Sequence, residues 1–259
     1  MILFFIVGVS SLSTIGIYSY LNAKDALLKR TLDQLTSIRV IKKGQIEFFF
    51  NERFNNLKLL SENEYIKWLS AELIANQQGQ LPNTANKELD YSLFGFNNMY
   101  LIVGSDPYKL SIYKFVDSKP IPLKIDLDLV GQLNEIWEKS CDSKELSIVD
   151  FKKRSINDFE PQCFIGKQIN KSKNQTVCVL ALQISVKDIN SIMLEDRPEN
   201  GLGESGEVYL VGDDFLMRSN SRFIENSVLR TTVKTLSAQN AFKNKIGSSL
   251  IDDYRTVAC

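Results

Sequence analysis

The first positions of the chain form an apolar stretch, and the first charged side chain is Lys24. A helix that crosses a bilayer needs about 20 predominantly apolar residues. We therefore predict a transmembrane helix over residues 1–22, with 2–22 embedded in the membrane. A secretory signal would show a basic start and a cleavage site of small residues, and this stretch has neither. The pattern indicates a retained anchor.

Residues 23–60 have the periodicity of one long amphipathic helix. Apolar side chains recur three and four positions apart at Leu28, Leu32, Leu35, Ile38, Ile46, Phe49, Phe50, Phe54, Leu57 and Leu60. The stretch has no proline and one glycine, Gly44. We predict a stalk helix of about 58 Å at 1.5 Å per residue. Such a rod can carry a displacement between a distant domain and the bilayer, and a coiled coil that acts only as a spacer is the alternative.

After residue 98 the pattern changes to short apolar runs typical of strands. These runs are MYLIV, LSIYKFV, LSIVDF, PQCFIGKQI and TVCVLALQI, with the helical stretch DLDLVGQLNEIWEKS after the second. We predict that residues 61–196 form an α+β module, a single antiparallel sheet with helices against one face. Ser61 and Glu64 resemble a capping box that opens a helix over 64–75, and a further helix is expected over 185–195.

A break at EDRPENGLG separates a second unit, residues 197–259. EVYLVG and DFLMRSN predict two strands, and residues 228–243 predict a helix. With only two recognisable strands, the unit is expected to be a truncated sheet domain.

Charge and composition restrict the function. The chain has 31 basic and 31 acidic side chains and no histidine. Balanced charge gives no long-range attraction to nucleic acid. Without histidine there is no phosphorylatable histidine, no histidine-dependent nucleophile system and no histidine-ligated metal. No paired carboxylate or Ser-Lys motif stands out either. We expect no catalytic residue, no metal, no cofactor and therefore no enzyme.

The cysteines are far apart and lack C-x-x-C spacing; they are Cys141, Cys163, Cys178 and Cys259. In the predicted hairpin Cys163 faces Leu182. Cys178 faces Lys167, about four residues out of step with the first thiol. Because a disulfide needs closely apposed Cβ atoms, we expect buried, unpaired thiols.

Gly201, Gly203 and Gly206 satisfy the G-x-G-x-x-G dinucleotide fingerprint. That chemistry needs a loop that leaves a strand and enters a helix, whose terminal amides hold the pyrophosphate. Here a helix precedes the glycines and a strand follows them. We interpret the glycines as a sharp turn between two modules.

The wider stretch GLGESGEVYLVGDDFLMRSNSRF, residues 201–223, resembles the start of the membrane-proximal module in double Cache sensor domains. These are the PAS-like periplasmic regions of chemoreceptors, sensor kinases and receptor-type nucleotide cyclases. The N-terminal span, the stalk LTSIRVIKKGQIEFFFNERFNNLKLLSEN, the run VCVLALQIS and DDYR near the end agree in the right order. The resemblance covers nearly the whole chain and implies two PAS-like modules, membrane-distal and membrane-proximal.

The resemblance implies a topology as well. Lys24, Lys29 and Arg30 follow the span and nothing basic precedes it, so charge bias alone would put the rest of the chain in the cytoplasm. The resemblance outweighs that rule: it implies that residues from about 23 onward lie outside the cytoplasmic membrane. It also implies a parallel homodimer through the stalk helices and signalling domains beyond Cys259. We expect a basic leader before the present start.

The implied function is ligand sensing for a transmembrane receptor, such as a methyl-accepting chemoreceptor of the cytoplasmic membrane. The sensor part of a histidine kinase or a nucleotide cyclase is one alternative. A structural, membrane-tethered module that binds another protein is a second.

In the resembled family the distal module holds a small ligand between its sheet and the covering loops and helix. Such pockets combine aromatic walls with a few polar groups. We expect walls from Tyr100, Tyr113 and Trp137. Asp150, which ends the third strand, would pair with an amine, so the ligand would be an amino acid, an amine or a carboxylate. The alternatives are aromatic rings that belong to the core and an Asp150 that balances basic residues 152–154.

Two arginines in the second unit have two interpretations. Arg218 and Arg222 could anchor a carboxylate or could form ion pairs with Asp213 and Asp214. We favour the internal ion pairs.

Overall fold

The computed structural model describes residues 2–75, 94, 96, 98–117, 119–123, 127–143, 146–152, 161–172, 176–194, 201–248 and 250–255. The polar stretch NQQGQLPNTANK, residues 76–87, which the sequence predicts to be a loop, lies outside these residues. Residues 195–200 of the predicted break and Cys259 lie outside them as well. The elements are α1 (Ile2–Glu62), α2 (Glu64–Ala75), β1 (Met99–Gly104), β2 (Ser111–Val116), β3 (Lys119–Pro122), α3 (Leu127–Asp142), β4 (Ser147–Lys152), β5 (Gln162–Lys171), β6 (Val177–Ser185), α4 (Val186–Met193) and α5 (Leu236–Ala241).

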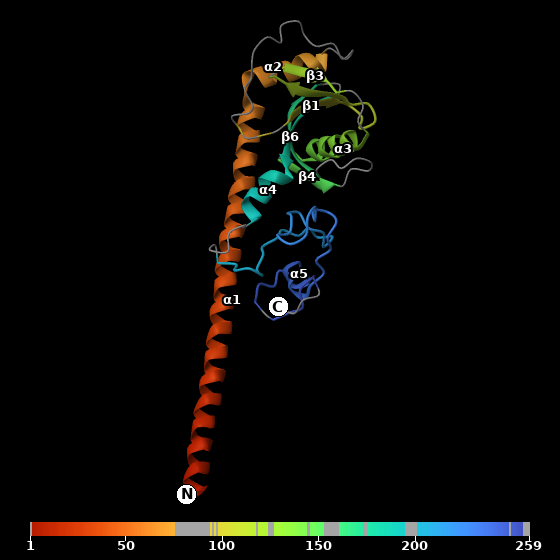
Figure 1. The fold of residues 1–259 in the computed structure, drawn as a ribbon. Coiled ribbons are helices and arrows are strands. Elements are labelled where there is room, and N and C mark those ends of the chain that lie inside the picture. Colours follow the sequence, from red (N-terminus) through yellow and green to blue (C-terminus); the bar gives the residue numbers. More distant parts are fainter. Residues whose placement is uncertain are drawn as a thin grey trace.

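The predicted span and the predicted stalk form one continuous helix. α1 has 61 residues and is about 92 Å long at 1.5 Å per residue. Figure 1 shows it as a rod whose N-terminal part projects away from the rest of the chain. The helix is long and apolar enough near its N-terminus to cross a membrane, and none of that apolar window is buried. The stalk ends at Glu62, two residues beyond the predicted boundary.

The start of α2 differs from the prediction. The capping box of Ser61 and Glu64 is wrong, because Ser61 Oγ donates within α1 to the carbonyl of Lys58 at 2.6 Å. Asn63 Oδ1 accepts instead from the amide of Tyr65 at 2.9 Å. An asparagine directly before a helix satisfies amides that the helix itself leaves free.

One antiparallel sheet of six strands has the order β3-β2-β1-β6-β5-β4. The predicted α+β class is confirmed, and each of the five strands predicted within residues 61–196 is present. The short strand β3 was not predicted. Its sequence KPIP contains two prolines, and proline is tolerated at the edge of a sheet, where one side of the strand needs no hydrogen-bonded partner.

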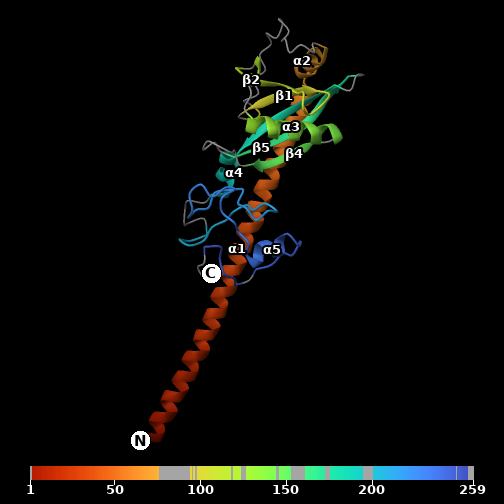
Figure 2. The same cartoon turned by 90° about the vertical axis from the view of Figure 1, so that its right-hand side faces the viewer.

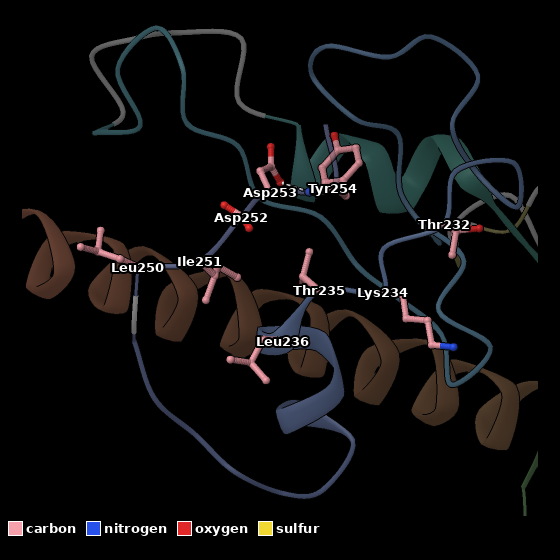
Figure 3. A pocket seen from close by; sticks show the side chains of 9 residues that line it. All are labelled: Thr232, Lys234, Thr235, Leu236, Leu250, Ile251, Asp252, Asp253 and Tyr254. Atoms are coloured by element: carbon pink, nitrogen blue, oxygen red, sulfur yellow. Dashed lines mark hydrogen bonds between the residues drawn. The ribbon is translucent and has the colours of Figure 1, made fainter. Parts of the chain in front are cut away.

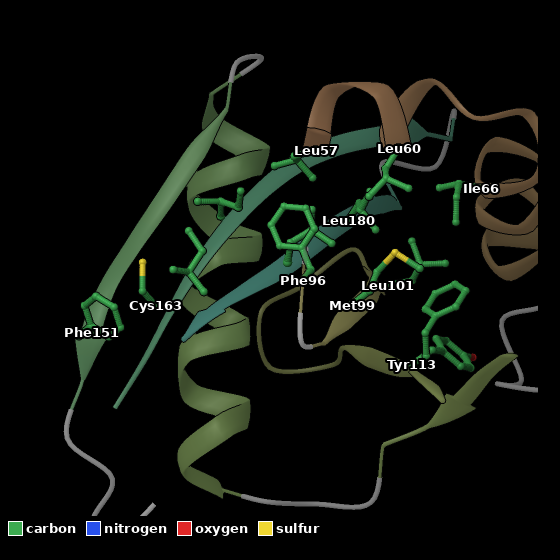
Figure 4. Packing of buried hydrophobic residues seen from close by; sticks show 14 of the residues in the cluster. Leu57, Leu60, Ile66, Phe96, Met99, Leu101, Tyr113, Phe151, Cys163 and Leu180 are labelled. Carbon is green, nitrogen blue, oxygen red and sulfur yellow. The ribbon is translucent and has the colours of Figure 1, made fainter. Parts of the chain in front are cut away.

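Helices cover both faces of the sheet, so the expectation of one covered face is wrong. Leu57 of α1 and Ile66 of α2 pack with Leu101 on one face (Figure 4). Ile136 of α3 packs with Ile102 on the other. The physical reason is visible in β6, which is buried at all of its positions. A strand that is apolar on both sides needs cover on both sides.

The β5–β6 hairpin has a different register from the predicted one. Cys163 faces Ile184, and Cys178 faces Asn170. The pairing is already offset by two residues at Cys163, and a bulge between Gln168 and Asn170 adds one more, because an extra residue on one strand displaces everything beyond it. The cysteines lie even further out of step than predicted.

The described cysteines are unpaired, as expected: Cys141, Cys163 and Cys178 are free. Burial raises the pKa of the Cys163 and Cys178 thiols. Burial, with a smaller effect of Asp142, raises the pKa of Cys141 to about 11. The described thiols are therefore weak nucleophiles at neutral pH.

The second unit contains less regular structure than predicted. The two expected strands are reduced to isolated bridges, Val211 with Met217 and Leu216 with Thr232. Phe215, the second residue of the DFLMRSN run, has a φ of 63°, a left-handed conformation that interrupts an extended strand. The predicted helix over 228–243 is shortened to α5 because Leu229 also has a positive φ of 56°.

The interpretation of the glycine motif as a turn is confirmed. Gly201 and Gly203 have φ values of 94° and 61°, which glycine adopts at little cost. Figure 1 and Figure 2 show the described part of the second unit beside α1.

Candidate functional site

The structure separates the three aromatic residues expected at a ligand site. Tyr100 and Trp137 belong to the core between α3 and the sheet. The Tyr100 ring meets Phe164 edge to face with 6.0 Å between centroids, and Trp137 Nε1 donates to the carbonyl of Val177 at 3.3 Å. Tyr113 lies in the core on the opposite face (Figure 4). Only two of the three can line a site under α3.

Asp150 is occupied by an arginine of the second unit. Its carboxylate Oδ2 lies 2.8 Å from Nη2 of Arg218 and accepts from Nε of the same side chain at 2.9 Å. The sequence analysis treated these two residues separately. It expected Asp150 to bind a ligand and Arg218 to form an ion pair within the second unit.

Tyr100 and several amide side chains lie at one end of the sheet, on the face that α3 covers. This amide cluster consists of Asn98, Tyr100, Gln132, Gln162 and Gln183. Gln183 Oε1 accepts from Nδ2 of Asn98 at 2.8 Å and from the Tyr100 hydroxyl at 3.5 Å. Gln132 of α3 donates through Nε2 to the Gln162 carbonyl at 2.9 Å. Strand alternation puts Gln162 on the same face as Phe164 and hence under α3.

The amide cluster contains unused hydrogen-bond acceptors. Gln132 is only 3% exposed. Within the described part of the chain, Oε1 of Gln132 and Oε1 of Gln162 have no hydrogen-bond partner. The orientation of the Gln132 amide is fixed, because its nitrogen faces a carbonyl oxygen. A buried, unsatisfied acceptor costs about 1–3 kcal/mol, so a bound molecule with N–H or O–H groups would be stabilised here.

Of the amide cluster, sequence reasoning predicted Tyr100 and missed the four amide side chains. One available signal was Gln183, a polar residue near the end of the otherwise apolar run VCVLALQIS. Gln132 gave no comparable signal, because a glutamine on an amphipathic helix normally faces solvent.

Arg218 forms the link between the two units. The side chain is 7% exposed and lies between Asp150 and Asp214, whose Oδ1 is 2.9 Å from Nη1. A Cβ at Gly212 would lie only 2.3 Å from the guanidinium carbon, so glycine leaves the room that this arginine occupies. The internal bridge is confirmed for Arg218 and Asp214. Arg222 instead donates to backbone carbonyls, including that of Gly206 at 2.9 Å.

Burial alone would raise the pKa of Asp214, but hydrogen bonds from Arg218 and the amide of Leu216, together with the arginine charge, outweigh it. The pKa of this carboxyl therefore lies below its usual value, and the ion pair stays formed at neutral pH.

Further hydrogen bonds attach the second unit to the helices. Asn190 of α4 accepts from the amide of Asn220 at 2.7 Å. On α1, Gln34 donates to the carbonyl of Gly201, and Lys42 donates to the last turn of α4. The second unit is therefore attached to both α1 and α4, and α1 and α4 are bonded to each other.

The second unit also has a small polar core. Glu207 is nearly buried, with 5% of its side chain exposed. It accepts from the Tyr254 hydroxyl at 2.5 Å and from the Ser221 hydroxyl at 2.8 Å. These bonds hold the last described segment, residues 250–255, against the start of the unit.

A cavity of about 560 Å³ lies beside that segment. Figure 3 shows the side chains of Leu236 and Ile251 in front of a helix, with Asp252 and Tyr254 further from that helix in this view. The lining residues are Thr232, Lys234, Thr235, Leu236, Leu250, Ile251, Asp252, Asp253 and Tyr254. One lysine and two aspartates give the cavity no clear preference for a ligand charge.

The sequence matches no protein-family model and no curated protein. Solved structures do match. The periplasmic sensory domain of the Campylobacter jejuni chemoreceptor Tlp1 has a TM-score of 0.57 and 18% identity, over 89% of this chain and 88% of that one. The ligand-binding domain of the C. jejuni chemoreceptor Tlp3, in complex with L-valine, has a TM-score of 0.53 and 16% identity, over 85% and 82%. This chain therefore has the fold of bacterial chemoreceptor sensory domains, as its resemblance to double Cache regions implied.

Proposed function

We propose that the chain is the extracytoplasmic ligand-sensing region of a bacterial transmembrane receptor of the chemoreceptor type, anchored in the cytoplasmic membrane. The observation that carries the proposal is the continuous helix α1, unburied and apolar near its N-terminus and packed against the sheet at its other end. The shared fold with a periplasmic sensory domain supports the same orientation.

The ligand site of this proposal is the amide cluster under α3. Its unpartnered carbonyl oxygens suit a small molecule that donates hydrogen bonds, such as the ammonium group of an amino acid or an amine. Domains of the same fold are known in complex with L-valine and with isoleucine. Asp150 does not serve as the amine partner in this proposal, because Arg218 holds its carboxylate.

The receptor acts as a parallel homodimer through α1. The side of α1 that faces away from the sheet carries an exposed apolar stripe. Its members Leu27, Ile41, Phe48 and Leu59 are 65%, 58%, 69% and 59% exposed. Ile41 and Phe48 are seven positions apart, the spacing of a coiled-coil seam. Gly44, on the same side, leaves room for a close approach.

Ligand binding would shift the distal module between two packings. The ion pair of Asp150 with Arg218 and the hydrogen bonds from Gln34 and Lys42 would pass that shift to α1. A rod anchored in lipid can carry a displacement of an ångström or two, as in other helix-shift mechanisms.

The proposal is tested on the full chain in native membranes and in nanodiscs. Cysteine introduced at exposed Lys187 should react with a membrane-impermeant reagent from the extracytoplasmic side. A thermal-melting screen of amino acids and amines in nanodiscs should then find a compound that raises the melting temperature.

Matched variants locate the site. Gln132→Leu should remove the thermal shift, because it removes the unpartnered oxygen, whereas Gln239→Leu on α5 should keep it. Labelling from the cytosolic side would rule out the orientation. A shift that survives Gln132→Leu would place the ligand elsewhere.

A further inference from the structure

A large groove runs between α1 and the segment around α5, away from the amide cluster. Its volume is about 1030 Å³, at the upper end of the range of about 300–1,000 Å³ for small-molecule pockets. The lining residues are Arg39, Val40, Lys43, Tyr209, Val211, Ser237, Ala238, Asn240, Ala241, Phe242, Asn244, Lys245, Ile246, Gly247 and Ser248.

The charged side chains of this groove are all basic. Arg39 and Lys43 come from α1 and Lys245 from the segment after α5, and the described lining includes no acidic residue. Arg39 uses one of its N–H groups on the carbonyl of Gly247 at 3.3 Å, and a guanidinium has five. Lys43 lies 3.6 Å from Glu47, but both side chains are more than half exposed, so this pair is weak.

Apolar side chains form a second part of the groove wall, beside the basic ones. Val40, Phe242 and Ile246 are 58%, 45% and 79% exposed. Exposed apolar groups that gather in one concave place indicate a binding surface. Apolar walls beside several cations match a molecule with an apolar body and a negative head.

We infer that this groove is a second ligand site, specific for a small amphipathic carboxylate. The carboxylate lies between Arg39 and Lys245, and the apolar body packs against Phe242 and Val40. This site goes beyond the proposed function, which places its ligand under α3. A ligand here contacts the rod directly, so it would alter the packing of the second unit on α1 without involving the sheet.

The test uses isothermal titration calorimetry of the full chain in nanodiscs, with empty nanodiscs as the blank. The probes are hexanoate and benzoate, each compared with its neutral amide, hexanamide and benzamide. The carboxylates should bind roughly tenfold or more tightly than the amides, because a charge-assisted hydrogen bond contributes at least a factor of ten. Equal affinity of acid and amide, or no binding of either acid, would overturn the inference.

Variants assign the binding to the groove. Arg39→Gln and Lys245→Gln should each weaken hexanoate binding by about tenfold, and Lys58→Gln, a control further along α1, should leave it unchanged. Lys245→Gln is the stricter test. Arg39 also donates to the carbonyl of Gly247, so Arg39→Gln removes a structural contact of the groove as well as a charge. Gln132→Leu in the amide cluster should not alter hexanoate binding. Unchanged affinity in both groove variants, with native circular dichroism, would contradict the site.

Discussion

At the scale of single residues, Arg218 illustrates how one buried charge can join two parts of a chain. A guanidinium removed from water must be paired, since an isolated buried charge is costly. Asp150 of β4 supplies one carboxylate and Asp214 of the second unit supplies the other. Gly212 leaves the space that the guanidinium fills.

Replacement of this arginine should weaken the native state. Arg218→Leu is expected to lower the free energy of unfolding by about 2–3 kcal/mol, and Asp150→Asn by about 1 kcal/mol, because the arginine then keeps one partner. Urea unfolding of the full chain in nanodiscs, followed by circular dichroism, measures both changes. Asp213→Asn, at an exposed neighbour, is the control and should change little. Equal stability of Arg218→Leu and the native chain would contradict the role of the ion pair.

The same ion pair should respond to acid. The pKa of Asp214 is lower in the folded chain than its ordinary value, so its contribution is fully present above about pH 4. That contribution should be lost as the pH falls from about 4 through the lower folded pKa. Asp214→Asn should make the free energy of unfolding less dependent on pH in this range. An unchanged acid dependence in the variant would show that other carboxyls are responsible.

At the scale of elements, the contact of α3 with the sheet depends on a glycine in β5. A Cβ added at Gly166 would lie 2.6 Å from Cγ1 of Ile136 and 2.8 Å from Oγ of Ser140. The helix therefore lies against bare backbone at this point. This close contact also holds Gln132, four residues before Ile136, against the first residue of β5.

Two glycine substitutions should act in opposite directions. Gly166→Ala is expected to lower the free energy of unfolding by about 1–3 kcal/mol, because it forces α3 away from the sheet. Gly131→Ala, within α3 and with nothing near its Cβ position, should raise it by about 0.5–1 kcal/mol through helix propensity. Thermal and urea unfolding of the two variants measure the difference. Destabilisation by both, or by neither, would contradict this packing of α3 on β5.

At the scale of the whole molecule, α1 connects every other part. The sheet packs on its C-terminal part, the second unit is attached near its middle through Gln34 and Arg39, and its N-terminal part projects beyond both (Figure 1). A single straight helix fixes the distances among these three regions.

Spin labels on α1 should report that geometry. Labels introduced at Lys29 and Lys58 through an unnatural amino acid should lie about 44 Å apart, at 1.5 Å per residue. Labels at Lys43 and Lys58 should lie about 22 Å apart by the same rule. Pulsed electron spin resonance in nanodiscs measures both distances. If only the distances between Lys29 and Lys58 were broadly distributed or much shorter, the helix would be broken between Lys29 and Lys43.

Local patterns in the sequence predicted the parts of the structure that local physics decides. The apolar stretch and the three-and-four periodicity predicted α1, because a helix needs only hydrogen bonds within its own segment. Short apolar runs predicted five of the strands, and the glycines at 201 and 203 predicted the turn. The unpaired thiols Cys163 and Cys178 followed from their separation along the predicted hairpin.

Only the tertiary structure decided which side chains meet. Tyr113 pairs with Leu101, not with Tyr100, across β1 and β2, and a shift of one residue sends a side chain to the other face of a sheet. The bulge in β5, the cover on both faces and the partner of Asp150 depend likewise on contacts between distant segments. The amide cluster exists for the same reason: α3, β1, β5 and β6 each contribute to it, and no single segment carries its pattern.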